Sequence, residues 1–204
     1  LQKNHMNKFS EIVKINDNNL KDVEEKHKKE INDIYLDCKT KNDIMDTMDG
    51  LFSSRPREEM LAIMKDSRVG GGGVLGFTLL MLLDFALLLD VPRSMLPQVL
   101  FVMPIISRLA LTIAIKFFPY ARPQGLGKSF HDYADRGAIF FATISAALLL
   151  IPFGVFVVLP LSLGLTVALI FARYVSGKLG GLTGDVYGAL SLLSETAALF
   201  AVCL

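Results

Sequence analysis

Polar and apolar positions divide the chain into two parts. Residues 1–40 are charged throughout and contain no Gly or Pro, and apolar residues recur at helical spacing between Leu20 and Ile34. This pattern predicts an amphipathic helix or a short coiled-coil segment. From Val69 onward, long apolar runs alternate with short polar ones. We therefore predict a polar helical segment over residues 1–40 and a membrane domain over residues 41–204.

The apolar runs are long enough to cross a bilayer, which takes about 20 residues of helix. Single spans are predicted at 69–89, 95–118 and 185–204. The run over 137–173 is too long for one straight span. Pro152 and Gly154 predict that it folds back as a hairpin of two helices, with Pro160 as a competing break.

The predicted fold class is all-α, a polytopic membrane helix bundle of about five spans, because backbone groups in lipid must pair internally. Five spans place residues 1–68 and the polar loops 119–136 and 174–184 on the same side. That side carries 19 of the 21 Lys and Arg residues. The positive-inside rule then predicts a multi-pass protein of the cell membrane with a cytoplasmic N-terminus.

Cysteine and histidine chemistry is not indicated. Cys38 and Cys203 lie far apart, and the three histidines are scattered, so neither a disulfide framework nor a zinc site is expected. The N-terminus lacks a basic start followed by an apolar run, so no signal peptide is expected. Hydrophobic residues make up 52% of the chain, which fits a membrane class, with the lipid bilayer as a partner and no nucleic acid.

Carboxylates and basic groups gather in the polar segments. Asp43, Asp46 and Asp49 are spaced three apart, so a helix would project them from one side. Gly50 then permits this helix to end in a turn, and Asp66 follows. Such acids could hold Mg²⁺ against a pyrophosphate, although a solvated helix face is the commoner reason for this spacing. The candidate phosphate ligands are Lys65, Arg68, Arg122 and Lys128. Contact with anionic lipid is the alternative for these four.

Two glycine clusters, over 69–76 and 180–188, do not fit a phosphate-binding loop, since neither matches the required pattern after a strand. Close helix packing is favoured, through the pairs Gly72/Gly76 and Gly184/Gly188. Asp84, Arg108 and Glu195 fall inside apolar spans. Both a role in the site and a role as ties between helices remain open for these three.

Three blocks carry a resemblance to a known family. They read DTMDGLFSSRPREEMLAIMKDSRVGGGGVLG, ARPQGLGKSF and GGLTGDVYGALSLLSE, in this order. The set resembles the cobalamin synthase (adenosylcobinamide-GDP ribazoletransferase) family, from about Asp43 to the C-terminus. The acidic motif of this resemblance lies within residues 43–68.

The resemblance implies a Mg²⁺-dependent transferase of the inner membrane. It would join adenosylcobinamide-GDP to α-ribazole or its 5′-phosphate and release GMP, and a homo-oligomer is left open. On this sequence, the resemblance makes Asp46, Asp49 and Asp66 candidates for catalysis and metal binding, and Asp185 a candidate ligand or base. Arg68 and Arg122 become candidate phosphate clamps, joined by Lys65 and Lys128 in substrate binding.

The chain also departs from the family pattern. Asn42 and Asp43 stand where the family has an acid and a Gly, and residues 1–40 are polar where members usually have apolar spans. Two alternatives follow. One is a degenerate, non-catalytic member whose charged head binds a partner. The other is a membrane alcohol phosphotransferase of the CDP-alcohol type, although the residues that follow Asp49-Gly50 do not match the motif expected of that class.

Overall fold

Helices account for most of the described chain, which comprises residues 43–66, 68–123, 126–133 and 136–204 of a computed structural model. All belong to one unit, Thr40–Leu204, and the helix predicted over 1–40 lies outside the described residues. Residues 43–52 form a helix, which we call the acidic helix. The further helices are α2 (Arg57–Ile63), α3 (Gly71–Asp90), α4 (Leu96–Phe117), α5 (Leu126–Tyr133), α6 (Arg136–Leu150), the 3₁₀ helix η1 (Ile151–Val157), α7 (Val158–Leu179) and α8 (Gly184–Val202).

The described part contains four helical segments that are long and apolar enough to cross a membrane: Gly71–Asp90, Leu96–Phe117, Ile139–Leu179 and Gly184–Val202. Their bounds lie within about two residues of the spans predicted at 69–89, 95–118 and 185–204. The described residues form no strand. The prediction of an all-helical, multi-pass membrane protein is therefore confirmed.

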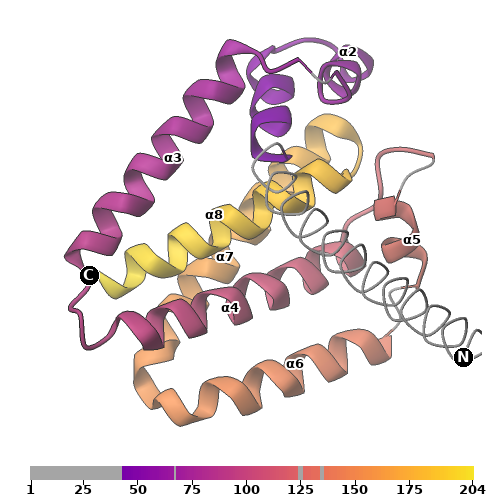
Figure 1. The fold of residues 1–204 in the computed structure, drawn as a ribbon. Helices are drawn as coiled ribbons and strands as arrows, with labels where there is room; N and C mark the ends of the chain where they lie inside the picture. The colour runs from indigo at the N-terminus through magenta and orange to yellow at the C-terminus, as the bar shows by residue number, and fades with distance from the viewer. Residues whose placement is uncertain (1–42, 67, 124–125, 134–135) are drawn as a thin grey trace, which may run out of the picture. The chain divides into compact units, whose positions relative to one another are not determined.

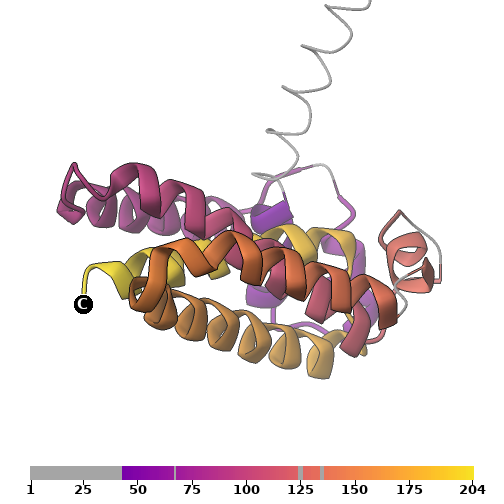
Figure 2. The same cartoon turned by 90° about the horizontal axis from the view of Figure 1, so that it is seen from below.

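The segment Ile139–Leu179 turns back on itself, as predicted. Gly154 has φ 59° and ψ −137°, a conformation that L side chains rarely adopt, and it lies within η1 together with Pro152. Figures 1 and 2 both show α6 and α7 running in opposite directions from this point. Pro160, the competing break, is instead buried in the first turn of α7. With 15 residues, α6 is shorter than a standard span, so five crossings stay a prediction.

The most buried of these segments is α8, which packs against α4 and α7 (Figure 1). Small residues make the close approach between helices possible. A Cβ atom at Gly164 of α7 would lie 2.8 Å from Ile106 of α4 and 3.1 Å from the carbonyl oxygen of Ser194 in α8. By contrast, α3 and α6 expose most of their large apolar side chains, as expected for surfaces that face lipid.

The charged residues inside the spans connect α3, α4 and α8. Arg108 Nη1 lies 3.1 Å from Glu195 Oε1, and the Ser107 hydroxyl donates to the same oxygen. Asp84 of α3 shares a hydrogen bond with Thr196, next to Glu195. These contacts favour the interpretation that Asp84, Arg108 and Glu195 link the helices to one another.

The structure corrects three local predictions. The loop over 119–136 contains a short helix, α5, and helix α7 continues to Leu179, so residues 174–179 are not a loop. The acidic helix does not end at Gly50, which is buried against Met64 and leaves no room for a side chain. It continues to Phe52, and Ser54 takes the left-handed conformation, with φ 51°.

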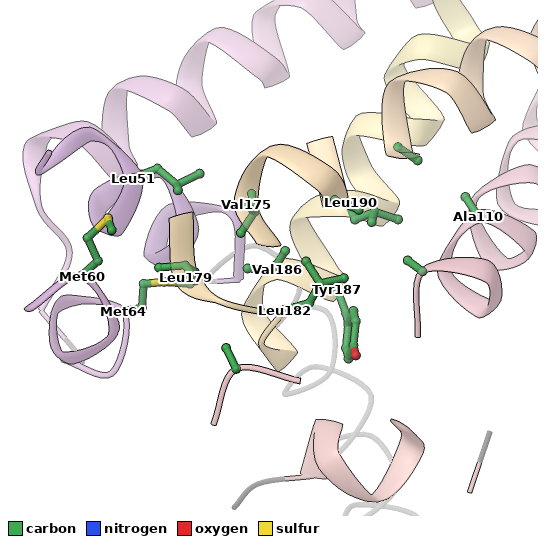
Figure 3. Packing of buried hydrophobic residues seen from close by; sticks show 14 residues of the cluster. Leu51, Met60, Met64, Ala110, Val175, Leu179, Leu182, Val186, Tyr187 and Leu190 are labelled. Atoms are coloured by element: carbon green, nitrogen blue, oxygen red, sulfur yellow. The ribbon is translucent and has the colours of Figure 1, made fainter. Parts of the chain in front are cut away.

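The polar segments meet at the end of the bundle opposite the α6–α7 turn (Figure 1). A cluster of buried apolar residues lies beneath them and comes from nearly every element there, namely residues 43–52, α2, α4, α7 and α8 (Figure 3). The labelled members are Leu51, Met60, Met64, Ala110, Val175, Leu179, Leu182, Val186, Tyr187 and Leu190. This cluster fixes the elements that carry the candidate site.

Candidate functional site

Asp49 joins the acidic helix to the start of α3. One of its carboxylate oxygens accepts a hydrogen bond from the backbone N–H of Gly70, and the other accepts one from Gly73, each at 2.6 Å. The first N–H groups of a helix have no partner within the helix, and the positive end of the helix dipole favours a carboxylate. Gly70, the N-cap of α3, has no side chain to offer. Asp49 therefore caps α3 from another segment.

The glycines of the first cluster make room for this contact. A Cβ at Gly73 would lie 2.6 Å from Asp49 Oδ2 and 2.7 Å from the carbonyl oxygen of Met45. Gly76 faces Met48 in the same way, and Gly72 faces Phe52. The predicted packing role of Gly72 and Gly76 is confirmed, and their partner is the acidic helix.

The second glycine cluster brings α8 toward the loop after α4. Ala121 N donates to Leu182 O and Leu182 N donates to Pro119 O, each at 2.8 Å. A Cβ at Gly181 would lie 2.6 Å from Pro119 O, so only glycine permits this approach. Thr183 then caps α8 by accepting from Val186 N.

The pairing of these two segments places Arg122 beside Asp185. Arg122 Nη2 lies 3.0 Å from Asp185 Oδ2, and both side chains are largely buried, at 23% and 19% exposure. Despite this distance, Nη2 is buried and forms no hydrogen bond of acceptable geometry within the described part of the chain. A buried guanidinium with an unused N–H is suited to an anionic ligand.

Of the second glycine pair, Gly188 packs closely as predicted, whereas Gly184 does not. Gly188 lies against the side chain of Asp43 and has no room for a Cβ, so α8 and the acidic helix approach closely there. Gly184 has nothing within 4 Å of a built Cβ, so packing does not explain it.

Asp46 is the carboxylate of the acidic helix whose pKa is shifted by the charges of Asp185 and Arg122. Burial raises the pKa of Asp46 from 3.8 to about 6, and the like charges of Asp185 and Asp49 add to the shift. Arg122 acts in the opposite direction. Asp46, Asp185 and Arg122 therefore form one electrostatic group, which we call the acidic site.

Asp66 and Arg68 are not in this group. They pair with each other at the surface, where Arg68 Nη2 lies 2.7 Å from Asp66 Oδ2, and this contact lowers the pKa of Asp66. Lys65 is exposed, and Lys128 of α5 donates to the carbonyl oxygen of Pro123. The predicted set Asp46, Asp49 and Asp66 is thus divided among three environments.

The described residues contain no group of three or more His, Cys, Asp or Glu side chains arranged to hold a metal ion. The predicted ligands Asp46, Asp49 and Asp66 are not such a group in the described part of the chain, so a magnesium site that uses all three stays a prediction. Mg²⁺ more often takes one or two carboxylates together with substrate phosphates. Asp46 and Asp185 fit this second mode, because the charge of Asp185 raises the pKa of Asp46 and a cation would relieve that repulsion.

Two residues that hold the site in place were not predicted. Thr183 directly precedes the first turn of α8, so the preference for Thr at helix starts could have indicated it. Arg57 donates to the carbonyl oxygens of Leu179 and Ala121, which are far away in sequence. No local signal predicts such a contact.

Taken together, the apolar spans and the acidic site at one end of the bundle define a multi-pass helical membrane protein with a group of interacting charged side chains at that end. The chain belongs to the family described as Cobalamin-5-phosphate synthase, whose family model matches residues 43–203. The resemblance inferred from the three sequence blocks is thereby confirmed, and the CDP-alcohol alternative is not favoured.

Several curated relatives bear the name adenosylcobinamide-GDP ribazoletransferase. The protein of Desulfitobacterium hafniense is 42% identical over 74% of this chain and 62% of its own length. That of Brevibacillus brevis is 39% identical over 76% of this chain and 64% of its own. That of Clostridium acetobutylicum is 33% identical, with coverages of 77% and 63%. The chain thus spans less than two thirds of the length of these relatives, and no solved structure matches it.

Proposed function

We propose that the chain catalyses the condensation of adenosylcobinamide-GDP with α-ribazole 5′-phosphate, or α-ribazole, releasing GMP. Its family and the names of its relatives support this reaction. The observation that carries the proposal is the acidic site, where Arg122 pairs with Asp185 beside Asp46 while its Nη2 makes no hydrogen bond in the described chain. A pyrophosphate needs positive charge and N–H donors, and the attacking hydroxyl needs a nearby acceptor for its proton.

The reaction exchanges a phosphoanhydride bond for a phosphate ester bond. The ribose hydroxyl oxygen of α-ribazole phosphate attacks the phosphorus attached to cobinamide, and a new P–O bond forms. The pyrophosphate bond breaks on the other side of this phosphorus, and GMP leaves with the bridging oxygen. A carboxylate of the acidic site takes the hydroxyl proton. Holding the two substrates in line and balancing their charge supplies most of the rate enhancement.

Mg²⁺ is part of this proposal. Asp46 and Asp185 would hold the ion together with substrate phosphate oxygens, and the ion would neutralise charge on the departing GMP. Arg122 would bind a phosphate oxygen with its free N–H. Lys65, Arg68 and Lys128 lie in exposed segments near this end and would attract the substrate rather than grip it.

We further propose that the acidic site faces the cytoplasm from the inner membrane. Of the Lys and Arg residues in the described part of the chain, all but Arg93 and Arg108 lie in or beside the polar segments at this end, as the positive-inside rule requires of a cytoplasmic side. Nucleotide-bearing substrates would then reach the site without crossing the bilayer.

Release of GMP tests the proposed reaction. The full chain, reconstituted in vesicles, is given adenosylcobinamide-GDP, α-ribazole 5′-phosphate and Mg²⁺, and nucleotides are separated by chromatography. We expect GMP only when both substrates and Mg²⁺ are present. A folded chain that releases no GMP would instead support a non-catalytic member of the family.

A further inference from the structure

Arg57, the first residue of α2, connects two segments that carry the acidic site. Its Nε donates to the carbonyl oxygen of Leu179 at 2.6 Å, and its Nη2 donates to the carbonyl oxygen of Ala121 at 3.1 Å. These acceptors lie 122 and 64 residues away in sequence. One guanidinium therefore spans two segments that a single point charge could not bridge in the same way.

The first acceptor is at the end of α7. The last carbonyl groups of a helix lack partners and carry the negative end of its dipole, so a cation is favoured there. Gly180 follows with φ 72°, the left-handed conformation common after a helix end. A Cβ at Gly180 would lie 3.2 Å from Arg57 Nε, so the absence of a side chain lets the guanidinium approach.

The second acceptor directly precedes Arg122. The same residue, Ala121, donates its N–H to the carbonyl oxygen of Leu182, which directly precedes the Thr183 cap and lies three residues before Asp185. The two partners of the Arg122–Asp185 ion pair thus lie on two short backbone segments that pair with each other. Arg57 binds one residue on each segment, at Ala121 and at Leu179.

We propose that Arg57 is a positioning residue that locks these two segments together and thereby holds the Arg122 guanidinium where substrate phosphate binds. This inference rests on the proposed function for the identity of the substrate. It goes beyond that function because, within the described chain, Arg57 forms hydrogen bonds to two backbone carbonyl groups and none to Asp46 or Asp185. Its effect on the reaction passes through Arg122.

The substitution Arg57→Lys is the informative one. Lysine keeps the positive charge near the end of α7 but lacks the planar fork that reaches both carbonyl groups. Arg55→Lys is the matched control, because Arg55 lies two residues earlier, is exposed, and pairs with Glu59 at 3.0 Å. Exposed ion pairs of this kind contribute little to the free energy of unfolding.

Steady-state kinetics distinguish positioning from general support of the fold. Arg57→Lys should raise the KM for adenosylcobinamide-GDP by about tenfold, the size expected for losing a hydrogen bond from a charged donor. The KM for α-ribazole phosphate should stay within about twofold, as should both KM values in the Arg55→Lys control. In an Arg122→Gln background, adding Arg57→Lys should have little further effect, because the two act as a unit. Equal increases in both KM values, or additive effects of the two substitutions, would overturn the proposal.

Hydrogen exchange tests the same idea without any need for activity. In the intact reconstituted protein, Arg57→Lys should speed exchange in peptides that contain the amides of Ala121 and Leu182, and Arg55→Lys should not. Unchanged exchange at both amides would contradict the role of Arg57. A parent protein that shows protected amides but releases no GMP would contradict the proposed function and leave the role of Arg57 as a lock supported.

Discussion

Asp46 and Asp49 have the same chemistry and lie three residues apart, yet their partners give them different roles. Both oxygens of Asp49 accept backbone N–H groups at the start of α3. Asp46 instead faces the charges of Asp185 and Arg122. Of the two, Asp46 is therefore the better candidate to contact substrate or metal, and Asp49 holds the helix that packs beside it.

Replacing Asp49 should first affect stability. Asp49→Ala removes both acceptors from the start of α3, and the loss of a helix cap costs about 1–2 kcal/mol of unfolding free energy. We expect a lower melting temperature in detergent, with the activity per folded molecule falling less than in Asp46→Asn. An Asp49→Ala protein with an unchanged melting temperature and no activity would instead place Asp49 in the catalytic site.

The pH dependence of the reaction should report the ionisation of Asp46. Its pKa is raised to about 6, so the carboxylate becomes protonated as the pH falls through this value and can no longer bind a cation or accept a proton. We expect kcat/KM for GMP release to fall about tenfold per pH unit below the midpoint.

Arg122 supplies the check on this assignment, because its positive charge lowers the pKa of Asp46. Arg122→Gln should therefore move the midpoint to higher pH, and Arg55→Gln should leave it in place. A midpoint that stays at the same pH in Arg122→Gln would show that another group controls the acid limb.

At the scale of elements, the reversal between α6 and α7 depends on the backbone of one glycine. Gly154 has φ 59°, and nothing lies within 4 Å of a Cβ built on it, so a substitution there meets backbone strain and no steric clash. Gly154→Ala should cost about 1–3 kcal/mol of stability. The thermal unfolding of the purified protein measures this loss.

Gly177 is the matched control for this prediction. It lies within α7, also has nothing within 4 Å of a built Cβ, and has no positive φ. Gly177→Ala should leave stability unchanged or raise it, by up to about 1 kcal/mol, because alanine favours a helix. Equal melting temperatures for the two variants would mean that the turn does not need the conformation of Gly154.

The helical elements and the residues of the site were predictable to different degrees. Apolar runs of span length predicted α3, α4 and α8 within about two residues, and Pro152 and Gly154 predicted the reversal between α6 and α7, although α7 continues six residues beyond its predicted end at 173. The helix α5 was missed because it is short and lies in a polar segment. Local spacing also predicted that Asp46, Asp49 and Asp66 would act together, whereas the partners of Asp49 and Arg57 are fixed by contacts between distant segments.

At the scale of the whole molecule, orientation in the membrane follows from the charges of the polar segments. Within the described residues, all Lys and Arg except Arg93 and Arg108 lie in or beside these segments, so the end with the acidic site should lie inside the cell. A single cysteine introduced at Pro123, which is exposed, should escape an impermeant thiol reagent applied to intact cells. A cysteine introduced at Ser94, in the exposed turn before α4, should react. Labelling at 123 but not at 94 would reverse the proposed orientation.

The central claim is that the acidic site at the polar end of the bundle condenses two substrates and releases GMP. The most direct measurement is the yield of GMP and of the corrinoid phosphate product in the same sample, for the parent chain, Asp46→Asn and the exposed control Glu58→Gln. We expect the parent and Glu58→Gln to form GMP and the corrinoid phosphate in the same yields. In Asp46→Asn, the yield of both products should fall by at least about 10²-fold while the melting temperature is retained. Near-normal, Mg²⁺-dependent formation of both products by Asp46→Asn would contradict this claim.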